Sequence, residues 1–374
     1  MQIICLQEKL KQALNITEKI IGRNLTLPIL NNLLLSTEDN KLKISSTNLE
    51  IGINCWLTGK IQKKGGITVP ARLISDLVNN LPNKKIELKV KDQQLELKCE
   101  KFKAVLKGLT AEDFPIIPKI KDKPIIKISG HTLKNSFSQV VEMVSFSESR
   151  PEISGVYMKF DKNTIKLAAT DSFRLAEKNI EIKNNQQIKG QSIIIPQRTI
   201  QELIRILGEK ELSANKEGQE VEIILSGNQV LFDLEGAQVI SRLIEGQYPD
   251  YQQIIPDSFQ TQAIINREEL INNIKIASLF SGKINNIKLA INSKKSLIEI
   301  TAKDVDIGEN KSQIETKING KDIEIIFNYR YLLDGLNNIF SDKIILGLNT
   351  NANPIVIRPV GDTSYTYLVM PIKV

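Results

Sequence analysis

Hydrophobic and polar residues follow the same pattern three times along the chain. In each copy, two apolar strand-like segments flank a polar turn, and an Asn or Asp residue follows them: Asn48, Asp171 and Asp304. Alternating apolar and polar positions are typical of antiparallel strands that bury one face. Because the three Asx residues recur at intervals of 123 and 133 residues, the pattern indicates an internal triplication.

The second half of each copy repeats as well. A strand ending in an arginine-bearing segment precedes apolar residues spaced i, i+3, i+4, which predicts an amphipathic helix after Arg72, Arg198 and Arg330. A hairpin follows each of these helices, over 86–99, 221–234 and 344–357, and another helix opens each copy, over 8–22, 132–143 and 267–280.

These elements predict an α+β fold of three tandem helix and antiparallel-sheet domains, with boundaries at 1–122, 123–258 and 259–374. The alternative is three unrelated α+β domains that resemble one another by coincidence. The matching order of helix, turn, Asx residue, arginine-bearing helix and hairpin favours triplication.

Composition adds little to this picture. The 374 residues include 50 Lys and Arg against 43 Asp and Glu, and the net charge of +7 permits a polyanionic partner without requiring one. No apolar run approaches the roughly 20 residues of a membrane span, and the segment 1–5 lacks the apolar core of a signal peptide. Three widely spaced cysteines, Cys5, Cys55 and Cys99, fit small buried hydrophobes in a reducing compartment. We therefore expect a cytoplasmic protein that does not act on a membrane.

The residues needed for catalysis are scarce. With His131 as the one histidine, neither a Ser-His-Asp triad nor a multi-histidine metal site can be assembled. No Gly-rich phosphate-binding loop occurs. The acidic pairs Asp304/Asp306 and Glu268/Glu269 fit a solvated charged face better than a Mg²⁺ site. We therefore expect a binding or structural protein rather than an enzyme, with no metal and no cofactor.

Four local motifs resemble those of the bacterial sliding clamps, the beta subunits of DNA polymerase III. They are Thr26-Leu27-Pro28-Ile29-Leu30, Ala168-Ala169-Thr170-Asp171-Ser172-Phe173-Arg174-Leu175-Ala176, Glu245-Gly246-Gln247-Tyr248-Pro249-Asp250-Tyr251 and Val369-Met370-Pro371-Ile372. The resemblance implies a head-to-tail homodimer that forms a six-domain ring around duplex DNA. In such a ring the sheets lie outside and twelve helices line the hole, so that DNA is held without regard to sequence.

The resemblance also implies a hydrophobic cleft for Gln-Leu-x-Leu-Phe-like segments of the DNA polymerase III catalytic subunit, the clamp loader and other proteins with a clamp-binding motif. The matching positions are Ile153, Thr170, Ser172, Arg174, Leu175, Pro249, Ile254, Pro354, Leu368, Val369, Met370, Pro371 and Ile372. Arg174 would supply a charged rim, and Phe173 stands where a histidine or tyrosine is common. For any one of these residues, ordinary core packing is the alternative.

Two further sets of residues follow from the resemblance. The expected DNA contacts are Arg23 and Arg150 in loops and Arg72, Arg198 and Arg205 on helices, although ion-paired solvated faces are an alternative for the helical positions. Glu152 and Gln253 replace residues that contact DNA in relatives. For the dimer, Ala104 and Leu106 would face Leu279 and Phe280. The competing function is a monomeric, repeat-built protein–protein scaffold that does not bind DNA.

Overall fold

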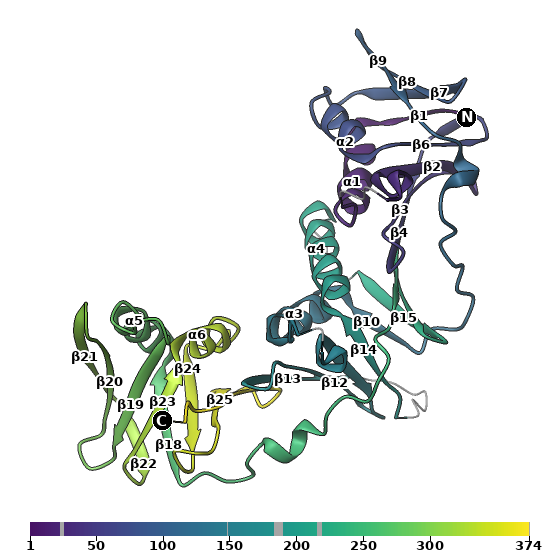
Figure 1. Ribbon diagram of the computed structural model, residues 1–374. Helices are drawn as coiled ribbons and strands as arrows, with labels where there is room; N and C mark the ends of the chain where they lie inside the picture. The colour runs from purple at the N-terminus through teal and green to yellow at the C-terminus, as the bar shows by residue number, and fades with distance from the viewer. Residues whose placement is uncertain (23–25, 148, 183–189, 215–218, 374) are drawn as a thin grey trace. The chain divides into compact units, whose positions relative to one another are not determined.

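The computed structural model spans residues 1–374 and describes all of them except 23–25, 148, 183–189, 215–218 and 374 (Figure 1). The first repeat contains β1 (Gln2–Leu6), α1 (Gln7–Glu18), β2 (Asn32–Glu38), β3 (Lys41–Thr47), β4 (Ile51–Thr58), β5 (Lys60–Lys63), β6 (Gly66–Pro70), α2 (Ala71–Asn79), β7 (Lys85–Lys91), β8 (Gln94–Cys99) and β9 (Phe102–Lys107).

The other two repeats follow the same order. The second contains β10 (Ile126–Ser129), α3 (Gly130–Val140), β11 (Gly155–Phe160), β12 (Thr164–Thr170), β13 (Arg174–Glu181), β14 (Ser192–Pro196), α4 (Gln197–Ala214), β15 (Glu220–Ser226), β16 (Gln229–Leu234) and β17 (Ala237–Arg242). The third contains β18 (Thr261–Asn266), α5 (Arg267–Ser278), β19 (Asn286–Asn292), β20 (Leu297–Asp304), β21 (Gly308–Glu315), β22 (Lys317–Gly320), β23 (Ile323–Asn328), α6 (Tyr329–Asn337), β24 (Lys343–Leu348), β25 (Ile355–Pro359) and β26 (Tyr365–Val369).

Short 3-10 turns lie between these elements, at η1 (Pro28–Asn31), η2 (Ala111–Asp113), η3 (Val141–Met143), η4 (Pro151–Ile153) and η5 (Tyr251–Ile254). The predicted triplication, the helices and the three hairpins are thus confirmed. The helices that were predicted to open each copy end two to four residues earlier than the apolar pattern suggested.

Two long antiparallel sheets join strands from successive repeats. An eight-stranded sheet has the order β10-β15-β16-β17-β4-β3-β2-β6, and a nine-stranded sheet has the order β14-β11-β12-β13-β26-β25-β24-β18-β22. The joints are the pairs β4·β17 and β13·β26, in which Gly52 lies opposite Ile240 and Leu175 lies opposite Leu368. Two smaller sheets, β5-β1-β7-β8-β9 and β21-β20-β19-β23, each belong to one repeat.

The repeated Asx residue forms the turn before β4, β13 and β21, the strands in corresponding places of the three repeats. In the first copy, Asn48 Oδ1 accepts the backbone N–H groups two and three residues later at 3.0 and 2.7 Å. Asp171 Oδ1 does the same at 2.9 and 3.0 Å, and Asp304 Oδ1 at 2.9 and 3.2 Å. The side chain thus replaces a backbone acceptor in a tight turn, which explains why Asn or Asp recurs there.

Within a repeat, two helices pack side by side against the sheets. In the first repeat α1 packs on α2 and β4, and in the third α5 packs on α6, β20 and β21 (Figure 1). The α1 face that does so carries buried Leu10, Ala13, Leu14 and Thr17, which is the i, i+3, i+4, i+7 spacing of an amphipathic helix.

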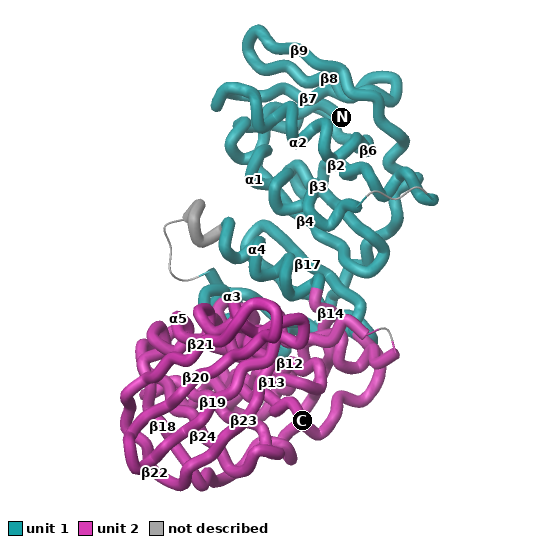
Figure 2. Tube along the Cα trace, turned by 60° about the vertical axis from the view of Figure 1, so that its left-hand side comes forward, with its two compact units in different colours: residues 1–134, 198–243 teal, residues 135–197, 244–374 magenta. Residues whose placement is uncertain are grey.

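Two compact units divide the chain, one of residues 1–134 and 198–243 and the other of residues 135–197 and 244–374 (Figure 2). The middle repeat contributes to both, because β15–β17 extend a sheet of the first repeat and β11–β14 extend a sheet of the third. The predicted three-domain boundaries therefore stay a prediction.

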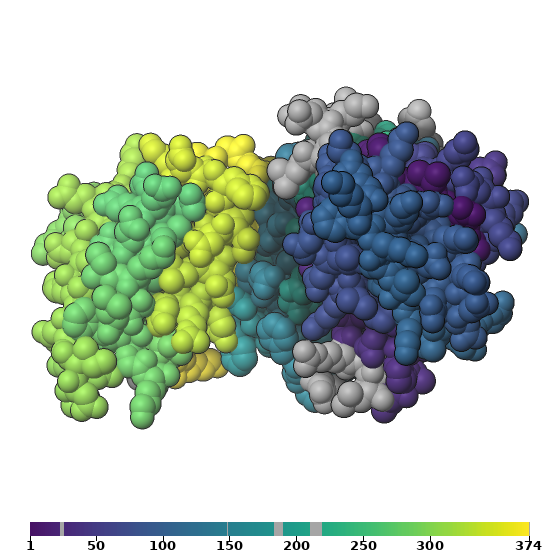
Figure 3. All heavy atoms as spheres, turned by 90° about the horizontal axis from the view of Figure 1, so that it is seen from above, coloured from purple at the N-terminus to yellow at the C-terminus, as the bar shows by residue number. Residues whose placement is uncertain are grey.

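The cores are mainly aliphatic, and two buried tyrosines in them form hydrogen bonds to backbone carbonyls. In the second unit, Tyr365 and Tyr367 are fully buried, and their hydroxyls donate to the carbonyls of Gln139 at 3.2 Å and Tyr331 at 2.8 Å. In the same unit β18 pairs with β24, so that the green and yellow surfaces of Figure 3 are continuous.

The three cysteines are free and buried, and burial raises the pKa of Cys5 to about 12.

A cluster of charges ties the connector after the first repeat to β2. The Glu38 carboxylate lies 2.5 Å from Lys119 Nζ and 2.9 Å from Lys43 Nζ. These charged hydrogen bonds lower the pKa of Glu38 to about 2. Residues around Lys119 are thereby held beside the eight-stranded sheet.

No helix in the described part of the chain is long and apolar enough to cross a membrane.

Two helical glycines predict opposite effects of the same substitution. In α6, a Cβ on Gly335 would lie 2.1 Å from the ring of the buried Tyr367, whereas in α4 a Cβ on Gly208 would meet nothing closer than Lys134 Cδ at 4.0 Å. Gly335→Ala should therefore lower the free energy of unfolding by about 1–3 kcal/mol. Gly208→Ala should raise it by roughly 0.5–1 kcal/mol, because alanine restricts the unfolded chain and suits a helix. Urea unfolding of both variants checks this, and effects of the same sign would contradict it.

Candidate functional site

The turn between β12 and β13 shapes one end of the predicted cleft. Thr170 Oγ1 donates to the carbonyl of Arg174 at 2.7 Å and accepts the N–H of Ser172 at 3.1 Å. Ser172 has a φ of +78°, a left-handed conformation that costs about a kcal/mol for a residue with a Cβ and persists only when its neighbours fix it. The hydrogen bonds to Thr170 and Asp171 do so, and they make this end of the cleft rigid.

Arg174 is held inside the turn rather than presented at a rim. Its guanidinium bonds Asp171 Oδ2 at 3.0 Å, pairs with Asp334, and donates to the Glu142 carbonyl at 3.2 Å. It also lies over the ring of Tyr331, 4.9 Å from the centroid, at a favourable cation–π distance. Arg174 thus links β13 to α6. Because only a tenth of its side chain is exposed and its charge is already paired with two aspartates, it is poorly placed to bind a ligand.

Apolar side chains from three segments pack into one buried cluster beside this turn, at the expected floor of the cleft. Ile153, Leu175 and Leu368 belong to one buried cluster with Tyr248 and Tyr251. Tyr248 stacks on Tyr157 with centroids 4.7 Å apart. Burial raises the pKa of Tyr251, and so does its 2.7 Å hydrogen bond to Glu177 Oε2. The tyrosine therefore stays a neutral donor that fixes the floor.

The remaining predicted cleft residues range from buried to exposed. Pro354 and Val369 are buried, Pro249, Met370, Pro371 and Ile372 are half-buried, and Ser172 and Ile254 are exposed. The segment that follows β26 is held by two backbone hydrogen bonds, since the N–H of Met370 donates to the Phe173 carbonyl at 2.8 Å and that of Ile372 to the Ile326 carbonyl at 2.8 Å.

Two aromatic side chains pair beside the predicted cleft, and the sequence analysis identified one of them, Phe173. Phe173, with 59% of its surface exposed, stacks on Tyr331, with ring centroids 6.2 Å apart and planes 19° apart. Tyr331 was not among the predicted residues. The paired aromatics extend the apolar surface, which agrees with the expectation that Phe173 makes this side more hydrophobic.

The predicted DNA-contacting arginines have different environments. Arg72 is exposed on α2. Arg150 donates to Glu152 at 3.1 Å and to Ser172 Oγ at 2.9 Å. Arg23 lies outside the described residues.

Both arginines of α4, Arg198 and Arg205, bind the end of another helix. Arg205 donates to the carbonyls of Asn15 and Ile16, and Arg198 donates to that of Ile20, at 2.9–3.0 Å. These carbonyls lie in or just after the last turn of α1, where no intrahelical donor is available. Arg205 also pairs with Glu202 and Glu209. Both side chains therefore hold α1 in place, whatever further role they have.

The predicted dimer residues lie on edge strand β9 and just after helix α5. On edge strand β9, Leu106 is 3% exposed and Ala104 is half-buried, whereas the exposed apolar residues are Phe102 and Val105. Leu106 thus packs inside its own unit, and sequence reasoning missed its two exposed neighbours. At the end of α5, Leu279 is 69% exposed and Phe280 is half-buried. Ile276 and Ile307, also exposed, add to that apolar edge.

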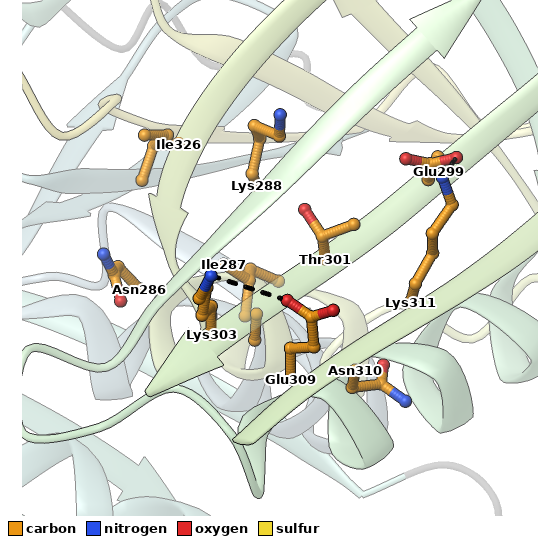
Figure 4. Close-up of a pocket in the computed structure, with 11 residues that line it drawn as sticks. Asn286, Ile287, Lys288, Glu299, Thr301, Lys303, Glu309, Asn310, Lys311 and Ile326 are labelled. Carbon is orange, nitrogen blue, oxygen red and sulfur yellow. Dashed lines mark ion pairs between the residues drawn. The ribbon is translucent and has the colours of Figure 1, made fainter. Parts of the chain in front are cut away.

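A separate depression of about 400 Å³ on the sheet of the third repeat is charged (Figure 4). Its lysines are ion-paired, Lys311 with Glu299 at 2.8 Å, Lys303 with Glu309 at 3.7 Å and Lys288 with Glu324 at 3.2 Å. Among the described residues, no three His, Cys, Asp or Glu side chains gather as a metal site requires.

Family models match nearly the whole chain. The N-terminal, central and C-terminal domains of the DNA polymerase III beta subunit match residues 1–118, 127–250 and 252–373. The beta sliding clamp of Synechocystis sp. is 28% identical over 393 residues that cover 100% of this chain and 99% of that protein. The beta sliding clamp of Staphylococcus aureus is 28% identical and covers 96% of both chains.

Solved structures of sliding clamps are similar to this chain over its full length. The DNA polymerase sliding clamp of Bacillus subtilis has a TM-score of 0.93 and 28% identity, with 100% of this chain and 99% of that chain covered. A sliding clamp from Pseudomonas aeruginosa bound to griselimycin has a TM-score of 0.93 and 25% identity over the full length of both chains. The chain therefore belongs to the DNA polymerase III beta subunit family, the bacterial sliding clamps.

Proposed function

We propose that two copies of this chain close head to tail into a six-domain ring around duplex DNA and tether the DNA polymerase III catalytic subunit, the clamp loader and other proteins with a clamp-binding motif. The three domains of each copy are 1–122, 123–258 and 259–374. The ring is a cytoplasmic processivity factor without enzymatic activity or cofactor.

Strand pairing between repeats is the observation that supports closure. In the chain, β4 pairs with β17 of the next repeat and β13 pairs with β26 of the next. The strands in the corresponding places are β21 in the third repeat and β9 in the first, and among the described strands each has a neighbour on one side only. A second copy that pairs its β9 with β21 repeats the same joint, and two such contacts close a ring.

The side chains at these two edges fit that pairing. An exposed edge strand invites pairing with another chain unless charge or covering protects it. Phe102 and Val105 on β9 are more than half exposed, as are Leu279 and Ile307 near β21. Burying these groups against each other removes apolar surface from water at both edges.

DNA binding rests on positive charge without base-reading geometry. Arg72 and Arg150 expose guanidinium groups, and Arg23, Arg198 and Arg205 add positive charge to the same set. Contacts of this kind neutralise phosphates and carry no sequence information. A ring that slides needs such weak, sequence-independent contacts.

Partner segments are proposed to lie on the floor formed by Ile153, Leu175 and Leu368. The other contacts are Thr170, Ser172, Pro249, Ile254, Pro354, Val369, Met370, Pro371 and Ile372, with the Phe173–Tyr331 pair at the side. Arg174 acts as a positioning residue for the turn. Apolar grooves with a flexible Met suit varied aliphatic and aromatic anchors.

Replacing Leu279 with Asp should abolish the dimer. The substitution places a carboxylate in the apolar contact, which costs several kcal/mol if no partner is present, so the dissociation constant should rise by on the order of a hundredfold or more. Phe146→Asp is the matched control, because Phe146 is 81% exposed but lies outside the proposed contact. Light scattering after gel filtration measures the mass, and a Leu279→Asp dimer at micromolar concentration would refute the proposed interface.

Removal of residues 370–374 should abolish binding of a fluorescent Gln-Leu-Ser-Leu-Phe peptide while the dimer stays intact. The truncation deletes Met370 and Ile372 together with their backbone hydrogen bonds to Phe173 and Ile326. Removing only residues 373–374 leaves both bonds and is the control, for which fluorescence anisotropy should report normal affinity. Unchanged affinity after the longer truncation would show that the peptide binds elsewhere.

A further inference from the structure

A cavity of about 300 Å³ lies beside the first sheet joint, in the unit that contains residues 1–134 and 198–243. It is lined by the turn after β3, by β4 and β17, and by the connector that follows the first repeat, with Leu49, Gly52, Pro115, Ile117, Ile240 and Arg242 among its residues. None of the sites described above includes these residues.

The backbone around this cavity repeats that of the peptide cleft. Thr47 Oγ1 donates to the Ile51 carbonyl at 2.9 Å and accepts the N–H of Leu49 at 3.0 Å, as Thr170 does in its own turn. Leu49 has a φ of +77°, against +78° for Ser172. The two turns therefore have the same conformation one repeat apart.

The strand that returns beside each turn is placed in the same way. The N–H of Arg242 donates to the Glu50 carbonyl at 3.0 Å, as the N–H of Met370 donates to that of Phe173 at 2.8 Å. Ile240 lies opposite Gly52 in the first joint, as Leu368 lies opposite Leu175 in the second. The connector that follows the repeat packs nearby in both cases: Pro115 and Ile117 line the cavity here, and Tyr248 and Tyr251 share a cluster with Leu368 there.

Side chains then make the two grooves chemically different. Glycine at position 52 lets the connector come close, since a Cβ there would lie 2.8 Å from Ile117 Cγ2. Ile117 packs against the cluster that contains Ile240 and forms an apolar floor. Leu49 is 48% exposed and Ile116 is 94% exposed at the cavity edge. A ligand that covers such an exposed isoleucine removes apolar surface from water, which favours binding.

Charge distinguishes the first groove most clearly. Arg242 stands where the cleft has Met370, and it is exposed. Arg174 in the other groove already forms ion pairs with two aspartates. No acidic side chain among the described residues lies within ion-pair distance of Arg242. Glu50 is its backbone neighbour and opposes an acidic ligand.

We propose that this groove is a second peptide site, which takes a short extended segment with one bulky aliphatic residue followed by an acidic residue. The aliphatic side chain fills the cavity over Ile117 and Ile240, and the carboxylate pairs with Arg242. A volume of about 300 Å³ is at the small end for ligand pockets, which suits one anchoring side chain. The inference rests on the proposed function, because the peptide cleft supplies the model for how such a groove is used.

The test uses a fluorescein-labelled Gln-Leu-Asp-Leu-Phe peptide and its uncharged partner Gln-Leu-Asn-Leu-Phe. The full chain should bind the acidic peptide at two sites per chain, and the chain without residues 370–374 should retain one. In that truncated background Arg242→Gln should weaken binding at least fivefold, and Glu50→Gln should strengthen it. Arg330→Gln, at an exposed arginine far along the sequence, is the control and should change nothing. The Asn peptide should bind this site as weakly as the Arg242→Gln variant binds the Asp peptide.

The outcomes separate this site from the peptide cleft. One site in the full chain and none after truncation would overturn the second site and leave the cleft standing. One site that survives truncation but depends on Arg242 would support the second site and refute the cleft. The proposal would be overturned if the truncated chain bound the peptide with an affinity that neither Arg242→Gln nor the Asp-to-Asn exchange changed. It would also be overturned if no form of the chain bound the peptide.

Discussion

Antiparallel pairing between the edge strands of successive repeats is the interaction on which the rest of the structure depends. Each joint satisfies two rows of backbone N–H and C=O groups that would otherwise be exposed, and it does so by extending a sheet rather than by adding a new core. The same requirement acts on β9 and β21, which have no second neighbour among the described strands. Oligomerisation thus follows from the rule that holds one chain together, because a second copy supplies the missing strand at each end.

The turn that precedes each joint strand is the structural element that the two proposed peptide grooves share. An Asx side chain, a Thr hydroxyl and one left-handed residue fix the backbone in the same way at Asn48 and Asp171. With the backbone fixed, the two grooves differ in a few side chains. Leu175 and Met370 make the second groove apolar, whereas Gly52 and Arg242 let the connector enter the first and leave a charge at its edge.

Much of the fold was predictable because it depends on local patterns. Alternation, helical spacing and the Asx residues are read from neighbouring positions, and triplication made each weak signal recur. The candidate site was proposed from motifs that resemble a known family, and the structure brings three of its residues, Ile153, Leu175 and Leu368, into one buried cluster. Long-range contacts were not predictable: Arg198 and Arg205 bind carbonyls at the end of α1, and Tyr331 on α6 stacks on Phe173 in the turn between β12 and β13. Leu106 also illustrates the limit, because the strand pattern does not say which face of an edge strand packs inward.

A closed ring holds the protein on DNA by topology and not by charge. A protein held by six phosphate contacts loses on the order of a thousandfold in affinity between roughly 50 and 200 mM salt. A closed ring escapes only through an open interface or a DNA end. After loading by a clamp loader onto nicked circular DNA, the protein should therefore remain bound through gel filtration at high salt and dissociate promptly once the DNA is linearised in the same buffer. Equal retention on circular and linear DNA, or loss from both at high salt, would contradict the account.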